Sequence, residues 1–218
     1  MYLKEIRLYS DQDVSKCSFL ETFHIQAEAI TDLFSSYLNK IYTDKVRIVN
    51  INCVSEKNFE KPILISPFLD VCILYDVGTF NELGDEEKEK ELVNLILRGM
   101  KVASEILDLD DALFMDIAKR ISFLDYKNRF IWKKPKFSPD KKLKAYVRVE
   151  WGLQKVKVEI VIEDKKKNCI LEEDVELKHP GRMGLDVLGE LVWIDSKTVE
   201  LRHQYIKDEV YQFSIKSV

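Results

Sequence analysis

The side chains that could do chemistry in this 218-residue chain are few and scattered. One of its three histidines lies in the loop His179-Pro-Gly-Arg-Met-Gly184, which is rich in turn-forming residues. A flexible backbone beside a cation can hold an anion, so His179 and Arg182, with His203, form one candidate ligand site. The loop matches neither the phosphate-binding loop nor the dinucleotide fingerprint, and a plain crossover loop has the same composition. His203 is in register with Val199 and Leu201, and we expect its ring to point at an apolar face.

A second candidate is the basic stretch 132–142. Its five lysines stand among aromatic residues: Lys133, Lys134, Lys136, Lys141 and Lys142, with Trp132 and Phe137. Such a patch can follow phosphates and stack bases. A solvated link between two lobes has the same composition, however, and the net charge of −4 argues against an obligate nucleic-acid binder.

The third candidate is an acidic surface on predicted helices. Residues 1–126 carry 14 Lys and Arg against 23 Asp and Glu, whereas residues 127–218 carry 20 against 15. Electrostatic complementarity steers partners toward such surfaces, so we expect a basic protein to bind the outward carboxylates. These are Glu87, Glu91, Glu105, Asp110, Asp111 and Asp116. Helix caps and the helix dipole explain part of the same pattern.

No motif for a catalytic residue, a cofactor or a metal stands out. The carboxylates near Asp110 lack the spacing of a calcium loop, and no G-x-S-x-G motif frames a nucleophile. The sequence leaves enzymatic activity open and favours a protein without it.

The four cysteines, Cys17, Cys53, Cys72 and Cys169, share no C-x-x-C spacing and stand mostly in apolar runs. We expect reduced, mostly buried thiols of a reducing compartment. The longest apolar run, Val71 to Tyr75, is far short of a membrane span. The prediction is a soluble cytoplasmic protein.

The elements that must position these residues are clearest in the second half of the chain. Apolar residues take every second position over 143–153 and again over 156–162, which predicts two strands with one buried face. Similar runs at 169–177, 187–194, 198–206 and 209–217 predict further strands, with tight connections at 151–154 and 195–197 and a charged tip at 164–168.

The first half mixes strands with helices. Apolar residues recur every three or four positions over 18–41, 85–107 and 113–124, which predicts three helices, the last two joined as a hairpin. Strands are predicted at 2–9, 49–53 and 71–75. The short segment between Pro62 and Pro67 is predicted to lie at a sheet edge, because proline cannot donate to a central ladder.

We therefore predict an α+β fold: a multi-stranded, mostly antiparallel sheet with about three helices and a β-rich C-terminal lobe. We expect a single compact unit over 1–218, with lobes 1–126 and 143–218 joined by the basic, proline-containing link 127–142. As a small acidic chain without a catalytic signature, it is similar in character to bacterial immunity and antitoxin-like proteins, a likeness that assigns no residue a role. The leading functional hypothesis is a non-enzymatic interaction module; the basic stretch and the His179 loop provide the alternatives.

Overall fold

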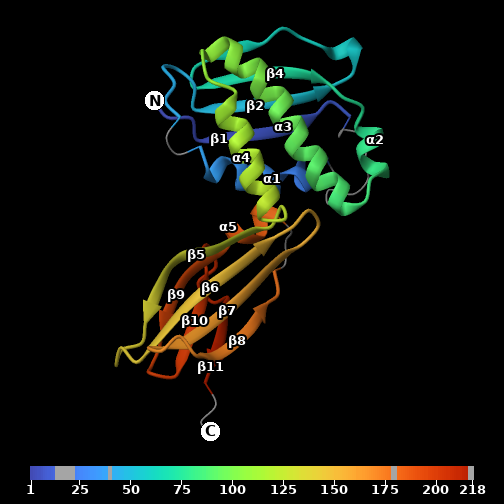
Figure 1. Cartoon of the computed structure of the whole chain (residues 1–218). Coiled ribbons are helices and arrows are strands. Elements are labelled where there is room, and N and C mark those ends of the chain that lie inside the picture. The colour runs from blue at the N-terminus through green and yellow to red at the C-terminus, as the bar shows by residue number, and fades with distance from the viewer. Residues whose placement is uncertain (13–22, 39–40, 178–180, 216–218) are drawn as a thin grey trace. The chain divides into compact units, whose positions relative to one another are not determined.

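The α+β class is confirmed by the structure of the protein, a computed structural model that describes residues 1–12, 23–38, 41–177 and 181–215 (Figure 1). Within these ranges the chain forms five α-helices and 11 strands in three sheets. It divides into two compact units, Met1–Asn128 and Arg129–Val218, called the first and the second unit below. The division falls inside the stretch predicted as a link.

The sheet of the first unit has the strand order β1-β2-β4-β3. Strands β1 (Glu5–Ser10), β2 (Ile48–Val54) and β4 (Phe68–Leu74) pair in parallel, and β3 (Ile63–Ile65) pairs antiparallel with β4. Parallel neighbours need a crossover, which α1 (Phe23–Ser36) provides between β1 and β2. The segment between the two prolines is the edge strand β3, as predicted.

Helices cover one face of this sheet. Helix α3 (Asp85–Leu107) packs on β4 and β2, and α4 (Ala112–Phe123) packs on α3 and α1. Gly99 in α3 lies so close to the sheet that an added Cβ would stand 2.5 Å from Cγ2 of Ile51. Helix α1 lies beside β1, where Ser35 Oγ accepts a hydrogen bond from the backbone N–H of Ile6 at 3.0 Å. This contact satisfies one backbone N–H of β1, the strand at one edge of the sheet.

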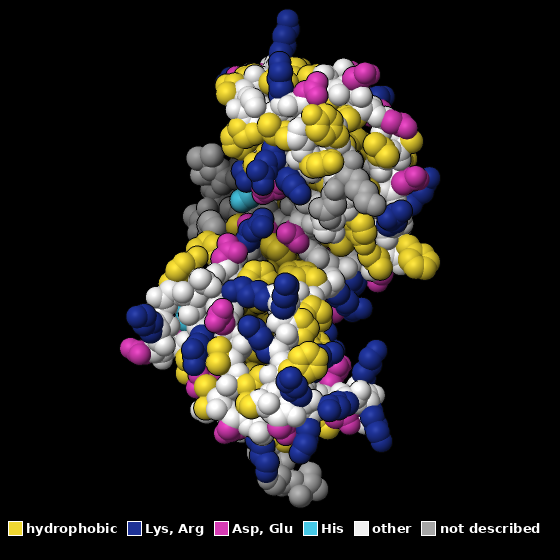
Figure 2. Space-filling model, turned by 90° about the vertical axis from the view of Figure 1, so that its left-hand side faces the viewer, with side chains coloured by type: hydrophobic (Ala, Val, Ile, Leu, Met, Phe, Trp, Pro, Cys, Tyr) yellow, Lys and Arg dark blue, Asp and Glu magenta, His cyan; other side chains and the backbone are white. Residues whose placement is uncertain are grey.

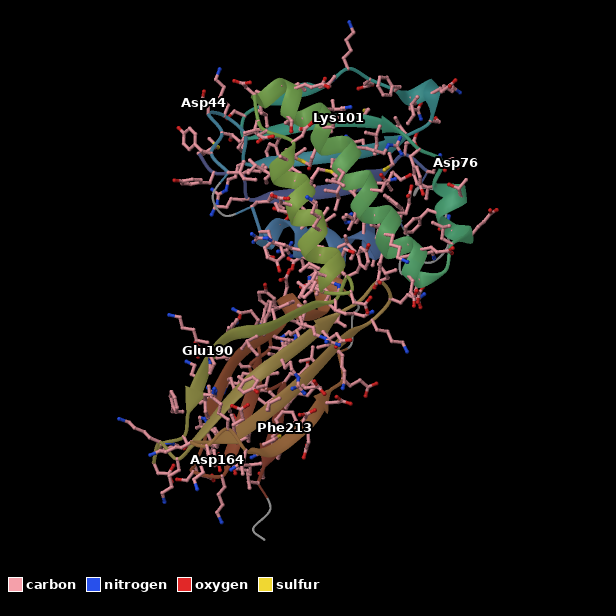
Figure 3. The ribbon with its side chains drawn as sticks, in the orientation of Figure 1. Asp44, Asp76, Lys101, Asp164, Glu190 and Phe213 are labelled. Carbon is pink, nitrogen blue, oxygen red and sulfur yellow. The ribbon has the colours of Figure 1, made fainter. Side chains whose placement is uncertain are left out.

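Polar side chains set the ends of the helices. Asp76 caps the short helix α2 (Val77–Glu82) by accepting from the N–H of Gly78 at 2.9 Å (Figure 3). Helix α3 begins after Gly84, whose N–H donates to Glu87 Oε2 at 3.0 Å, and ends at Asp108 in the left-handed conformation. The third predicted helix corresponds to α4, and the predicted cap of the first helix, at 18–21, lies outside the described residues.

The second unit consists of two antiparallel sheets (Figure 1). One has the order β5-β6-β7-β8, from β5 (Asn128–Phe137), β6 (Leu143–Trp151), β7 (Val156–Asp164) and β8 (Cys169–Val175). The other has the order β11-β10-β9, from β9 (Leu188–Trp193), β10 (Thr198–His203) and β11 (Val210–Ser214). Their core is the alternating apolar face, where Val147, Ile160 and Leu201 are no more than 1% exposed. The strands predicted from alternation are therefore present.

Three local expectations are corrected. Most of the predicted link is strand β5; its Pro135 is tolerated because β5 lies at the edge of its sheet, where a missing N–H breaks no central ladder. Part of the predicted loop at 179–184 is the short helix α5 (Gly181–Asp186), in which Gly184 and Leu185 are buried. Cys169 is exposed rather than buried, whereas Cys53 is buried as expected. Cys17 lies outside the described residues.

Candidate functional site

The six carboxylates of the predicted acidic surface do not gather into one patch. Glu87 and Glu105 lie 18 residues apart on α3, and a helix rises about 1.5 Å per residue, so about 27 Å separates them. Several carboxylates already have partners within the first unit. Glu87 caps α3, Glu91 accepts from Asn94 Nδ2 at 3.1 Å, and Asp110 accepts from the N–H of Ala112 at 2.9 Å.

The remaining three carboxylates are exposed. Asp116 forms an ion pair with Lys119 at 3.1 Å. The carboxylates of Glu105 and Asp111 have no hydrogen-bond or ion-pair partner among the described residues. Cations such as Lys101 also lie on the outside of α3 (Figure 3). The helical surface therefore has mixed charge, and the two predicted carboxylates without a partner, Glu105 and Asp111, lie near the α3–α4 turn.

Of the three residues of the predicted ligand site, the structure describes Arg182 and His203. His179 lies outside the described residues, and Arg182 is exposed on α5. His203 ends β10, where its Nδ1 accepts from the N–H groups of Tyr205 at 3.1 Å and Ile206 at 3.0 Å. Its ring therefore stabilises a turn and does not enter the core, because the β9–β10 register shifts between Leu201 and His203.

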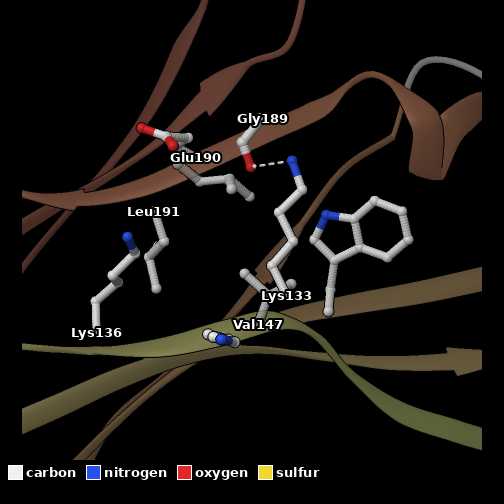
Figure 4. A pocket seen from close by; sticks show the side chains of 9 residues that line it. Lys133, Lys136, Val147, Gly189, Glu190 and Leu191 are labelled. Atoms are coloured by element: carbon white, nitrogen blue, oxygen red, sulfur yellow. Dashed lines mark hydrogen bonds between the residues drawn. The ribbon is translucent and has the colours of Figure 1, made fainter.

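The basic stretch, in contrast, borders a cavity of about 200 Å³ in the second unit (Figure 4). We call it the β5 pocket. It lies between β5 and β9, the edge strands of the two sheets, which do not pair with each other. Residues from four strands line it: Trp132, Lys133, Lys134, Lys136, Val147, Gly189, Glu190, Leu191 and Leu201. Four of these nine residues belong to the basic stretch 132–142.

Lys133 joins the two sides of the pocket. Its ammonium donates to the carbonyl of Gly189 at 3.1 Å (Figure 4). It also donates to the carbonyl of Leu188 at 3.2 Å and to Gln204 Oε1 at 3.3 Å. On the same side of the sandwich, Trp193 Nε1 donates to the carbonyl of Lys136 at 3.0 Å. These side-chain donors bridge two edges that no strand-to-strand ladder joins. Lys133 therefore holds the pocket together, and its donors are already used.

The other two lysines of the pocket are available to a ligand. The side chains of Lys134 and Lys136 are exposed, and their ammonium groups form no ion pair or hydrogen bond with any described residue. Across the opening from Lys136 stands the carboxylate of Glu190, on β9 (Figures 3 and 4). The floor is apolar, since Val147, Leu191 and Leu201 belong to the core of the sandwich. The pocket thus combines an apolar floor with a rim of net positive charge.

Trp132 supplies one further polar group. Its indole Nε1 is buried and has no hydrogen-bond partner among the described residues. The ammonium of Lys133 lies 5.8 Å from the centre of the Trp132 ring, within reach of a cation–π interaction. A buried donor without an acceptor is uncommon in native proteins. The pocket wall beside Trp132 therefore carries an unused hydrogen-bond donor.

A different cluster of charges, on the outer face of β6, β7 and β8, is structural. Glu159 accepts from Arg148 Nε at 2.8 Å and from Lys157 Nζ at 2.6 Å, and these bonds lower the pKa of its carboxyl group to about 2. Nearby, burial and the hydrogen bond to Glu163 raise the pKa of Tyr146 to about 12. These contacts join side chains of the neighbouring strands β6, β7 and β8 across the sheet.

Sequence reasoning found the lysines of the β5 pocket but missed its other half. Glu190 and Gly189 stand in an ordinary strand pattern, and nothing in that pattern places them opposite residue 133. The one available signal was a glycine inside a predicted strand, which often marks a close approach of another backbone. A Cβ at Gly189 would stand 2.5 Å from the carbonyl oxygen of Arg202. Lys141 and Lys142 lie in the β5–β6 turn, outside the pocket lining, and Lys142 pairs with Asp140 at 3.6 Å. Phe137, at the end of β5, is exposed.

None of the described helices is long and apolar enough to cross a membrane. Among the described residues no three His, Cys, Asp or Glu side chains are grouped so as to hold a metal ion. Comparisons of the chain with protein-family models, with curated proteins and with solved structures find no match.

Proposed function

We propose that the protein is a non-enzymatic binding protein whose second unit holds an anionic group in the β5 pocket. One observation carries this proposal: two unpaired lysines, Lys134 and Lys136, stand at the rim of a cavity that Lys133 holds between two sheets. Ligand sites are concave and combine apolar surface with a few placed polar groups. This cavity has an apolar floor and a charged rim.

The charge of the second unit favours an anion over a cation. Its sequence contains more Lys and Arg than Asp and Glu, and Figure 2 shows Lys and Arg side chains over much of its visible face. Such a field raises the local concentration of anions and the rate of their association. At the rim itself, three lysines stand against the single carboxylate of Glu190.

The proposal is tested by titrating ¹⁵N-labelled protein with inorganic phosphate at constant ionic strength. The amide signals of Gly189 to Leu191 are expected to move in a saturable way. Replacing Lys134 and Lys136 together with methionine should abolish the change, because methionine keeps the apolar stem and removes the charge. The matched control is Lys165→Met with Lys166→Met, which removes two exposed lysines from the β7–β8 turn of the same unit. Equal responses of the two double variants would refute the proposal.

A second candidate function is the docking of a basic protein on the first unit. It is supported by the exposed and unpaired carboxylates of Glu105 and Asp111, near the α3–α4 turn. Exposed hydrophobic side chains lie nearby in the sequence, with Ile106 41% and Leu113 44% exposed. Charged groups beside exposed apolar groups are typical of an interaction surface with a polar rim.

A further inference from the structure

The dimensions of the β5 pocket restrict what it can hold. At about 200 Å³ it is smaller than the roughly 300–1,000 Å³ of sites that enclose drug-sized ligands. A cavity of about 150 Å³ in a protein core can take up a benzene ring. The β5 pocket therefore has room for a body of about six carbon atoms with one small polar group, and not for a whole nucleotide.

The floor and the rim of the pocket favour two different groups in one ligand. The apolar side chains of the floor, Val147, Leu191 and Leu201, favour an aliphatic or aromatic body. At the opening, the ammonium groups of Lys134 and Lys136 favour a negative charge. A bare inorganic anion would leave the floor uncovered, and a purely apolar ligand would leave the lysines unpaired.

We propose that the ligand of the β5 pocket is a small amphiphilic anion: a body about the size of a six-carbon chain or ring, with one terminal carboxylate or phosphate. This inference rests on the proposed function and specifies its ligand class. The apolar body packs on the floor, and the anionic group stays at the rim between Lys134 and Lys136.

Glu190 limits the negative charge of the ligand that the rim can bind. Its carboxylate stands opposite Lys136 and repels an incoming anion. The repulsion is greater for a doubly charged phosphate ester than for a singly charged carboxylate. Glu190→Gln should therefore tighten binding of hexyl phosphate more than binding of hexanoate. Because Glu190 is exposed, this variant is expected to fold.

The ligand class is tested by comparing acetate, hexanoate, hexyl phosphate and 1-hexanol on the wild-type protein, with the three tryptophan indole signals and the amides of Gly189 to Leu191 as readouts. Four additional methylene groups, if fully buried, strengthen binding by up to about 200-fold. We expect hexanoate to bind at least about tenfold more tightly than acetate. Hexanoate should also bind more tightly than 1-hexanol, and this second difference should vanish when Lys134 and Lys136 are replaced by methionine.

The outcomes separate this inference from the proposed function. If hexanoate binds no more tightly than acetate while phosphate still binds through Lys134 and Lys136, the pocket holds anions but the amphiphilic class is wrong. Tighter binding of an eight-residue oligothymidine than of hexanoate would also overturn the class and point to the exposed face of β5. If no anion moves the signals of Gly189 to Leu191, both proposals fail.

Discussion

The contact between Gly99 of α3 and Ile51 of β2 gives the sharpest test of how the first unit is packed. A Cβ at position 99 would stand 2.5 Å from Cγ2 of Ile51 and 2.6 Å from each of Cδ1 and Cγ1. Carbon atoms in contact prefer about 3.5–4.0 Å, so Gly99→Ala must push the helix and the sheet apart by about 1 Å. Overpacking of this kind costs about 1–3 kcal/mol. The gain in helix propensity from glycine to alanine offsets about 1 kcal/mol of that cost.

We expect Gly99→Ala to lower the free energy of unfolding by up to about 2 kcal/mol in the wild-type background. In the background of Ile51→Ala the sign should reverse, because all three crowded atoms are gone and only the propensity gain of about 1 kcal/mol remains. Ile51→Ala by itself should cost about 2–5 kcal/mol. A double-mutant cycle measured by urea denaturation isolates the coupling between the two positions.

Two optical probes report on the two units separately. All three tryptophans, Trp132, Trp151 and Trp193, belong to the second unit, whereas the long helices belong to the first. Helical circular dichroism should therefore follow the loss of stability caused by Gly99→Ala, and tryptophan fluorescence should follow the second unit. A stabilising effect of Gly99→Ala in the wild-type protein, or an effect of the same sign and size in both backgrounds, would show that Ile51 does not crowd position 99.

Two further predictions concern charged groups. The carboxyl group of Glu159 has an ordinary pKa of 4.5, which falls to about 2 in the folded protein. This shift corresponds to roughly 3 kcal/mol of folding stability. Solvent around the half-exposed Lys157 screens the interaction and reduces the contribution to about 1–2 kcal/mol. Because the pKa is lowered in the folded state, this contribution is present above about pH 4.5 and is lost as the pH falls toward 2. Glu159→Gln should therefore destabilise the protein at pH 7. A difference in unfolding free energy between wild type and variant that stayed constant between pH 5 and 2 would contradict this. For the first unit, Glu105→Gln with Asp111→Asn should slow association with immobilised poly-L-lysine at low salt and flatten its salt dependence. An unchanged on-rate would show that these carboxylates are merely solvated.

The sequence by itself determined the elements whose signals are local. Alternation over 143–162 is a property of neighbouring residues, so the strands β6 and β7 could be predicted within a residue or two. The same holds for α3, whose apolar residues recur at helical spacing after an acidic first turn, and for the edge strand β3 between two prolines. The lysines of 132–136 were found for the same reason, as a compositional feature of one stretch.

Tertiary structure alone decided which elements meet. The parallel pairing of β1 with β2 depends on a crossover through α1, and nothing local distinguishes it from an antiparallel arrangement. The β5 pocket depends on contacts such as that of Lys133 with Gly189, 56 residues apart, and on a left-handed backbone at Lys133 with a φ of 56°. His203 illustrates the same limit, because a register shift in β10 turned a ring predicted to face the core into an acceptor for its own turn. A side chain's type sets what it can bind, but its neighbours depend on pairings between distant strands that no short window of sequence contains.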